Sequence, residues 1–228
     1  MSCLNSHNYQ KYNIGRLCGV DGTSVGSLNS SFATNAKNIS DSTTASLVRR
    51  TALQLFVSNG FQSVSLRQLA EGVGIQAGSL YNHIESKQAL LFDFIEELDS
   101  LLLHVTVKGF RRRMEAQDAL RLFIKNYMKL ALENRALYIL SRRELCNLSV
   151  EQQTYINCIR VELLEALSEI ICRGRLKGEF TVKDDRLTAS TICATLDGAL
   201  SLNWIFEINS QALIAQIQSF VLQAILNK

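Results

Sequence analysis

Proline is absent from the sequence and glycine is scarce, with 12 glycines among 228 residues. These two residues make most tight turns, so their shortage argues against a β-sandwich or β-barrel, which needs many turns. Hydrophobic residues make up 47% of the chain and charged residues 20%. This composition allows a substantial buried core and excludes a wholly disordered chain. Most of the remaining residues favour helices, so the composition predicts an all-α protein.

The sequence also lacks the residue clusters of a metal protein or an enzyme. None of its six cysteines forms a C-x-x-C pair and no cysteine–histidine cluster has ligand spacing, so we expect no metal site and no cofactor. The histidines are His7, His83 and His104, and the sequence contains no nucleophile elbow, phosphate loop or metal motif. It therefore predicts a protein that is not an enzyme. Two alternatives stay open: a helical enzyme that acts on a lipid-like substrate through His104, and a helical scaffold that binds another protein.

Signals for export or membrane insertion are missing too. The N-terminus shows no basic segment followed by an apolar core. Residues 208–227 carry no charge, but serine, asparagine and glutamine interrupt them, so we expect an interface helix rather than a membrane span. Four cysteines stand in apolar, helical surroundings where we expect reduced thiols: Cys146, Cys158, Cys172 and Cys193. Together these observations predict a cytoplasmic protein that does not bind membranes.

Composition and periodicity divide the chain into three regions. Residues 1–40 are rich in serine and asparagine and show no sustained period, which predicts a disordered tail. Helical spacing of apolar residues follows, with a first domain at 41–90 and a larger helical domain at 91–228. About nine helices are expected. The first ends near 59, two short helices span 66–71 and 76–82, and a long helix begins after residue 86. The others lie near 117–133, 136–147, 150–173, 184–207 and 210–226.

The two short helices of the first domain carry the main functional signal. Ser65 and Gln68 form a capping box that opens the first of them, and Gly72 and Gly74 bracket the tight turn that follows. Two helices joined by a glycine-containing turn after a longer helix are typical of a helix-turn-helix, whose second helix enters the major groove of DNA. The small residues at 77–79 would let that helix approach DNA closely. Four basic and two acidic side chains within 46–92 fit an anionic partner.

The run 47–97 resembles the DNA-binding domain of TetR-type transcriptional regulators. Two positions depart from the family pattern: Ile84, where phenylalanine is more frequent, and Gln76, where serine or threonine is. The elements that carry the resemblance are Ala52, Leu55, Phe56, Gly60, Phe61, the run 65–70, Gly74, Ile75, Gly78, Ser79, Leu80, Tyr81, His83, Ile84, Ser86, Lys87, Leu90 and Leu91.

The resemblance implies that the chain binds double-stranded DNA at a palindromic operator. Residues 76–79 and Asn82 would face base edges, and Tyr81, His83 and Lys87 would hold the backbone. Hydroxyl, imidazole and ammonium groups suit phosphate oxygens, and amides suit adenine edges. The alternative is a structural His83 and a solvated Lys87. The implied DNA-binding residues are Ser65, Arg67, Gln76, Ala77, Gly78, Ser79, Tyr81, Asn82, His83 and Lys87.

The resemblance also implies that 91–228 binds a small effector that releases a repressor from DNA, with an activator as the alternative. The stretch 143–204 is similar to a TetR subgroup that senses acyl-CoA thioesters or related lipids. Arg143 could meet an anionic ligand, whereas the aromatic candidates could also be ordinary core. The candidate ligand-binding residues are Phe110, Phe123, Tyr127, Arg143, Tyr155 and Trp204.

The last two expected helices suit a homodimer. Dimerisation has a functional reason, because two recognition helices must meet two half-sites about one DNA turn apart. Small residues at 194, 198 and 201 would allow close helix approach, and the alternative for the apolar stripe on the last helix is an intramolecular core. That stripe comprises Leu213, Ile217, Phe220 or Val221, and Ala224.

Overall fold

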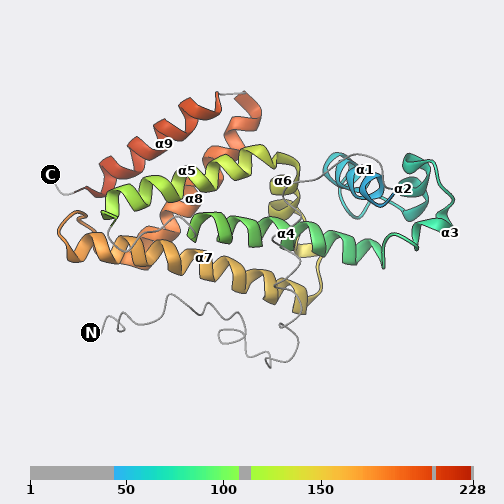
Figure 1. Cartoon of the computed structure of the whole chain (residues 1–228), viewed down its shortest axis with the longest axis horizontal. Helices are drawn as coiled ribbons and strands as arrows, with labels where there is room; N and C mark the ends of the chain where they lie inside the picture. The colour runs from blue at the N-terminus through green and yellow to red at the C-terminus, as the bar shows by residue number, and fades with distance from the viewer. Residues whose placement is uncertain (1–43, 108–113, 207–208, 227–228) are drawn as a thin grey trace. The chain divides into compact units, whose positions relative to one another are not determined.

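The computed structural model describes residues 44–107, 114–206 and 209–226, without the side chains of 202–206, and the regular elements in these ranges are helices (Figure 1). This confirms the predicted all-α fold. An isolated antiparallel bridge joins Phe180 to Leu226. The α-helices are α1 (Thr44–Asn59), α2 (Leu66–Val73), α3 (Ala77–Leu80), α4 (Lys87–Val107), α5 (Ala116–Glu133), α6 (Arg135–Arg143), α7 (Val150–Leu176), α8 (Asp185–Phe206) and α9 (Ser210–Ile225). Within the described residues, none of them combines the length and apolar character needed to cross a membrane.

Local capping residues begin the helices where the sequence predicts. The Ser65 hydroxyl accepts the Gln68 N–H at the start of α2, and a second capping box formed by Ser149 and Gln152 opens α7. The Ala89 N–H donates to Ser86 Oγ over 2.9 Å at the start of α4. These contacts satisfy backbone donors that have no partner inside the helix.

Two helices are shorter than predicted. The second short helix, expected over 76–82, covers only Ala77–Leu80. The helix expected over 136–147 ends at Arg143, and a 3₁₀ turn, η2 (Leu145–Asn147), follows it. In that turn Asn147 Nδ2 donates to Glu144 Oε2 over 2.7 Å, which folds the chain back on itself before Ser149 opens α7. A local side-chain bond of this kind competes with helix continuation.

The buried apolar residues form two clusters, and α4 contributes to both. Phe94 and Ile95 of α4 belong to a cluster with α1, α2 and α3, together with residues of α6 and the beginning of α7. Leu98 and Leu102, one to two turns further along α4, belong to the cluster of α5, α7, α8 and α9. Figure 1 shows α4 running from α3 into the larger helical bundle. A single helix therefore takes part in both packing units.

Two glycines occupy places that a larger residue would disturb. Gly74 has φ +79°, a left-handed conformation that closes the turn between α2 and α3 and favours glycine. Gly174 lies where a Cβ atom would come 2.2 Å from Phe180 Cδ2. Its lack of a side chain lets Phe180 pack directly on α7. Beside this contact, the Thr181 N–H donates to the Ile225 carbonyl over 2.7 Å and ties the end of α9 to the bundle.

Candidate DNA-binding surface and effector pocket

The helix-turn-helix turns its apolar side inward and a polar side outward. Leu69 of α2 and Leu80 of α3 are fully buried, and the Ile75 N–H donates to the Ala70 carbonyl over 3.0 Å across the turn. Exposed residues occupy 76–79 and 81–83, and the Tyr81 side chain is 59% exposed. Ser65 and Arg67 are exposed as well. Nine of the ten predicted DNA-binding residues are thus accessible to a partner.

Lys87 is the exception, because its side chain is partly buried and its ammonium group is bonded within the protein. Its Nζ donates to the Phe61 carbonyl over 2.9 Å and to the Val64 carbonyl over 2.8 Å, and it lies 4.2 Å from the centre of the Phe61 ring. Burial lowers the pKa of this half-buried ammonium group. The side chain therefore holds α4 to the loop between α1 and α2, because its ammonium group hydrogen-bonds two carbonyls of that loop.

The end of α6 contacts the end of α1. Arg143 Nη2 donates to the carbonyls of Phe56 and Val57 over 2.7 and 2.9 Å. Arg143 Nε also donates to Oε1 of the buried Glu144 over 2.8 Å. A cation placed at the C-terminal carbonyls of a helix compensates their partial negative charge. Arg143, a candidate ligand-binding residue, is therefore bonded to the end of α1.

Asn147 extends this contact to the segments on either side of the helix-turn-helix. Gln62 Nε2, after α1, donates to Asn147 Oδ1 over 2.6 Å. Gln88 Nε2, at the start of α4, donates to the Asn147 carbonyl over 2.6 Å. The segment from α6 to η2 is therefore hydrogen-bonded to α1, to the loop after it and to α4.

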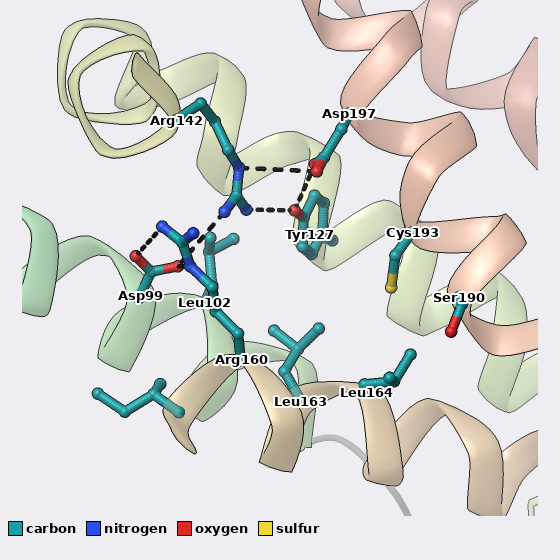
Figure 2. Close-up of a pocket in the computed structure, with 11 residues that line it drawn as sticks. Asp99, Leu102, Tyr127, Arg142, Arg160, Leu163, Leu164, Ser190, Cys193 and Asp197 are labelled. Atoms are coloured by element: carbon teal, nitrogen blue, oxygen red, sulfur yellow. Dashed lines mark hydrogen bonds and ion pairs between the residues drawn. The ribbon is translucent and has the colours of Figure 1, made fainter. Parts of the chain in front are cut away.

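A pocket of about 240 Å³ lies among five helices of the larger bundle (Figure 2). Each of α4 to α8 contributes at least one side chain. Figure 2 shows a charged group formed by Asp99, Arg142, Arg160 and Asp197, with Leu163 and Leu164 of α7 beside it. The lining residues are Asp99, Leu102, Tyr127, Arg142, Ile159, Arg160, Leu163, Leu164, Ser190, Cys193 and Asp197.

Asp99 of α4 is buried and accepts hydrogen bonds from several elements. Arg160 of α7 donates to both carboxylate oxygens, with Nε 3.2 Å from Oδ1 and Nη2 3.0 Å from Oδ2. Ser141 Oγ donates to Oδ2 over 2.8 Å, and Arg142 Nη1 lies 3.7 Å from Oδ1. A bidentate guanidinium–carboxylate pair is among the stronger polar contacts in proteins. It therefore holds α4 to α7 at the pocket.

Asp197 of α8 forms the second half of the charged wall. Its Oδ1 accepts a hydrogen bond from the Tyr127 hydroxyl over 2.8 Å and another from the Tyr138 hydroxyl. Arg142 Nη2 donates to the Tyr127 hydroxyl over 2.8 Å, and Arg142 Nε lies 3.7 Å from Asp197 Oδ2. Burial raises the pKa of both tyrosines. Both hydroxyls therefore stay protonated at neutral pH and act as donors to the carboxylate.

Comparison with known families identifies the chain's class. A model of bacterial regulatory proteins of the tetR family matches residues 48–94, and a tetracyclin repressor-like C-terminal domain model matches residues 114–201. Together the two models match more than half of the chain. The chain belongs to the TetR family. It is therefore a DNA-binding transcriptional regulator of this family and not an enzyme, as the sequence predicts.

Curated relatives of this TetR protein carry different names. It is 23% identical over 165 residues to a fatty acid metabolism regulator protein of Bacillus subtilis, covering 72% of this chain and 84% of that one. It is 29% identical over 160 residues to the nucleoid occlusion factor SlmA of Escherichia coli, covering 68% of this chain and 79% of that one.

Solved structures of TetR regulators share its fold. A tetR-family regulatory protein from Rhodococcus RHA1 is 22% identical, with a TM-score of 0.73 over 80% of this chain and 97% of that one. The transcriptional regulator FadR from Bacillus subtilis, in complex with stearoyl-CoA, is 20% identical, with a TM-score of 0.63 over 78% of this chain and 97% of that one.

One of the predicted ligand-binding residues, Tyr127, lines the pocket of the TetR chain. Phe123 is fully buried and stacks behind Tyr127, with ring centres 6.2 Å apart. Tyr155 packs instead against Phe92, with ring centres 5.9 Å apart. These two residues belong to the cores rather than to the pocket wall. Phe110 and the side chain of Trp204 lie outside the described residues, as does the predicted 1–40 tail.

Sequence reasoning missed the four charged pocket residues: Asp99, Arg142, Arg160 and Asp197. A charged residue between apolar residues of a helix was the only sequence signal for them. This signal is not sufficient, because most such side chains are solvated. The pocket also contains the Cys193 thiol, whose pKa burial raises to about 12, so it stays protonated at neutral pH. Cys146, Cys172 and Cys193 form no disulfide.

Helices α8 and α9 present an uncharged exposed surface, which includes the small α8 residues at 194, 198 and 201 but only part of the predicted α9 stripe. Leu213 and Val221 of the predicted α9 stripe are buried in the core of the bundle, whereas Phe220 is 58% exposed. The α9 stripe is therefore divided between an intramolecular core and an exposed edge. On α8 one stripe of exposed residues carries no charge: Leu187, Thr191, Ala194, Gly198 and Ser201.

Proposed function

We propose that this regulator is a homodimeric repressor that a small hydrophobic or acyl-CoA-type effector releases from a palindromic operator. The observation that carries the proposal is the link between pocket and helix-turn-helix through α6. Arg142 of α6 lines the pocket, and the next residue, Arg143, hydrogen-bonds the end of α1. An effector that moves Arg142 would therefore also move the adjacent Arg143, which is hydrogen-bonded to α1 of the DNA-binding domain.

The exposed surface of α3 and the turn after it supplies the proposed DNA contacts. Gln76, Ser79 and Asn82 would meet base edges, where amides and hydroxyls distinguish base pairs. Ser65, Arg67, Tyr81 and His83 would contact the phosphate backbone, which fixes the register of the protein on DNA. Lys87 takes no direct part in this proposal, because its ammonium group already bonds two carbonyls.

The effector class is supported by the pocket and by the relatives together. The pocket has an apolar side formed by leucines and an isoleucine, which suits an aliphatic group. A relative is a fatty acid metabolism regulator, and a structural neighbour was solved with stearoyl-CoA. We infer that the effector is acyl-CoA or lipid-like. Because the operator is bacterial chromosomal DNA in such regulators, we propose that the protein acts in the cytoplasm.

The homodimer is proposed on the exposed face of α8. Small, uncharged residues recur there at three- and four-residue spacing, so a second helix could pack closely against it. The exposed Phe220 of α9 would add apolar area to the same assembly. A two-fold dimer would present two recognition helices to the two halves of a palindrome.

Operator binding is tested by measuring affinity for selected duplexes as a function of salt. If the dimer neutralises 6–10 phosphates, affinity should fall about 10³–10⁵-fold between 50 and 200 mM salt. Tyr81→Ala should weaken binding to all duplexes alike, whereas Asn82→Ala should relax the preference at one base pair by about 1–3 kcal/mol. Unchanged binding by both folded variants would contradict the proposed contacts, and a flat salt dependence would contradict DNA binding itself.

A further inference from the structure

The walls of the effector pocket differ in their chemistry. Two carboxylates and two guanidinium groups gather on the side formed by α4, α6, α7 and α8, and Figure 2 shows them directed toward one another. The apolar part of the wall is formed by Leu102 of α4 and by three aliphatic residues of α7. The charged members are Asp99, Arg142, Arg160 and Asp197, and the apolar members include Leu102, Ile159, Leu163 and Leu164.

The positive and negative side chains of the pocket wall neutralise one another. The Asp99 carboxylate accepts two hydrogen bonds from the Arg160 guanidinium and one from the Ser141 hydroxyl. Asp197 takes the hydroxyls of Tyr127 and Tyr138 and lies 3.7 Å from Arg142 Nε. Two positive groups thus face two negative groups. Among the described residues that line the pocket, no cation is left without a carboxylate within ion-pair distance.

This balance determines which ligand groups the pocket can accept. A ligand carboxylate would add a third negative charge beside Asp99 and Asp197, with Arg142 and Arg160 already paired. It would have to displace Asp197 from Arg142 or remain buried without a partner, and a buried unpaired charge is costly. An uncharged aliphatic or acyl group meets no such penalty and can contact the leucines.

The size of the pocket points to part of a ligand rather than a whole one. Its 240 Å³ lies below the roughly 300–1,000 Å³ of cavities that enclose a drug-sized molecule. A chain of methylene groups fits such a volume, whereas a nucleotide headgroup would have to stay outside it. The ligand group inside the pocket would then be joined to its carrier through an uncharged carbonyl linkage.

We propose that this pocket binds the uncharged acyl group of an ester or thioester, and that Asp197 excludes the corresponding free carboxylate. The proposal rests on the proposed function in treating the pocket as the effector site. Asp197 is then a specificity-determining residue. Its negative charge keeps Arg142 from serving as a counter-ion for a fatty acid.

The test compares a matched pair of probes by calorimetry on the full chain: ethyl octanoate, which is neutral, and octanoate, which is charged. Octanoyl-CoA is measured beside them. The wild-type protein should bind the ester at least about tenfold more tightly than the acid. Asp197→Asn keeps the size of the side chain and removes its charge, so it should reduce this preference by about tenfold or more. Arg142→Gln removes a positive charge from the pocket wall, so it should increase the preference for the ester over the acid further.

Asp118→Asn, the same substitution at an exposed position on α5, is the control and should keep the wild-type preference. Thermal unfolding checks that each variant folds; if Asp197→Asn does not fold, Arg142→Gln carries the test. Acid binding as tight as ester binding by the wild type overturns the proposal. So does an unchanged ratio in Asp197→Asn, or no binding of esters and thioesters from four to sixteen carbons. Operator binding is measured in parallel, so failure of the ligand proposal is distinguished from failure of the regulator proposal.

Discussion

Arg142 and Arg143 are consecutive residues of α6, yet their guanidinium groups bind opposite partners. Arg142 Nη2 donates to the Tyr127 hydroxyl in the pocket over 2.8 Å, and Arg143 Nη2 donates to the Phe56 carbonyl at the end of α1 over 2.7 Å. Neighbouring positions on a helix point about 100° apart. One turn of helix therefore contacts both the effector pocket and the DNA-binding domain.

Replacing Arg143 should weaken the response to effector more than the binding of operator. Arg143→Met removes the two hydrogen bonds to the α1 carbonyls, and because the side chain is about half exposed, we expect a stability loss of only about 1 kcal/mol. The melting temperature should fall by about 2–4 °C. Fluorescence anisotropy of a labelled operator, titrated with effector, should show release shifted to higher effector concentration.

Arg186→Met is the matched control for this change, because Arg186 is exposed on α8 and pairs with Glu165. It should leave effector release as in the wild type. A normal response by Arg143→Met, with the control also normal, would contradict transmission through α6.

Replacing Lys87 should affect stability rather than phosphate binding. Lys87→Met removes the two hydrogen bonds to the carbonyls of Phe61 and Val64, and we expect the free energy of unfolding to fall by about 1–3 kcal/mol in urea titrations. Lys125→Met, at an exposed position of α5, should have little effect. If Lys87→Met instead kept its stability and reduced the salt slope of operator binding by about one, a phosphate contact would be restored.

The sequence predicted most accurately those features that depend on neighbouring residues. The capping boxes at Ser65 and Ser149 and the left-handed turn at Gly74 follow from contacts within three or four positions, and they mark helix boundaries correctly. The helix-turn-helix is built from such local signals, so the order of residues along the chain is enough to locate its elements. The end of α6 is an exception, because Asn147 folds back on Glu144 there.

The pocket depends on contacts between distant parts of the chain, so the sequence did not reveal it. Asp99 and Asp197 lie on different helices and resemble solvated acids when each is taken alone. Arg142 and Arg143 have the same chemistry, and the packing of α6 against α1, α4 and α5 decides which one faces the pocket. Lys87 likewise bonds residues 23 and 26 positions away.

The buried tyrosines should give the protein a distinct alkaline titration. Burial raises the pKa of Tyr127 and Tyr138 above the ordinary value near 10. Above pH 10 the folded state therefore holds protons that the unfolded state releases. The contribution of these groups to the free energy of unfolding is complete below pH 10 and is lost as the pH rises through their folded pKa values. Absorbance at 295 nm should show a late-ionising fraction among the six tyrosines.

Phenylalanine substitutions assign that fraction. Tyr127→Phe and Tyr138→Phe should each remove part of the late-ionising signal, while Tyr81→Phe, at an exposed position, should remove part of the early one. Ionisation of all tyrosines in one step near pH 10, while the protein remains folded, would show that the hydroxyls are not held as described.

The dimer is tested by a charge on the α8 stripe. Thr191→Arg places a cation on the proposed interface, where an unpaired buried charge should shift the protein to monomer and abolish tight operator binding. Thr154→Arg is a matched control on α7, because both threonines are exposed and donate to the carbonyl four residues earlier. Sedimentation should distinguish them, and a Thr191→Arg protein that remains dimeric would place the interface elsewhere.

The central claim is that an acyl-type effector controls sequence-specific DNA binding by this TetR protein. The most direct measurement is selection of randomised duplex DNA on the purified protein, repeated in the presence of a panel of acyl-CoA thioesters. The account predicts an enriched palindrome that is lost from the selection when one thioester is present. An enriched palindrome that every thioester leaves bound would contradict the effector class, and the absence of any enriched sequence would contradict the account as a whole.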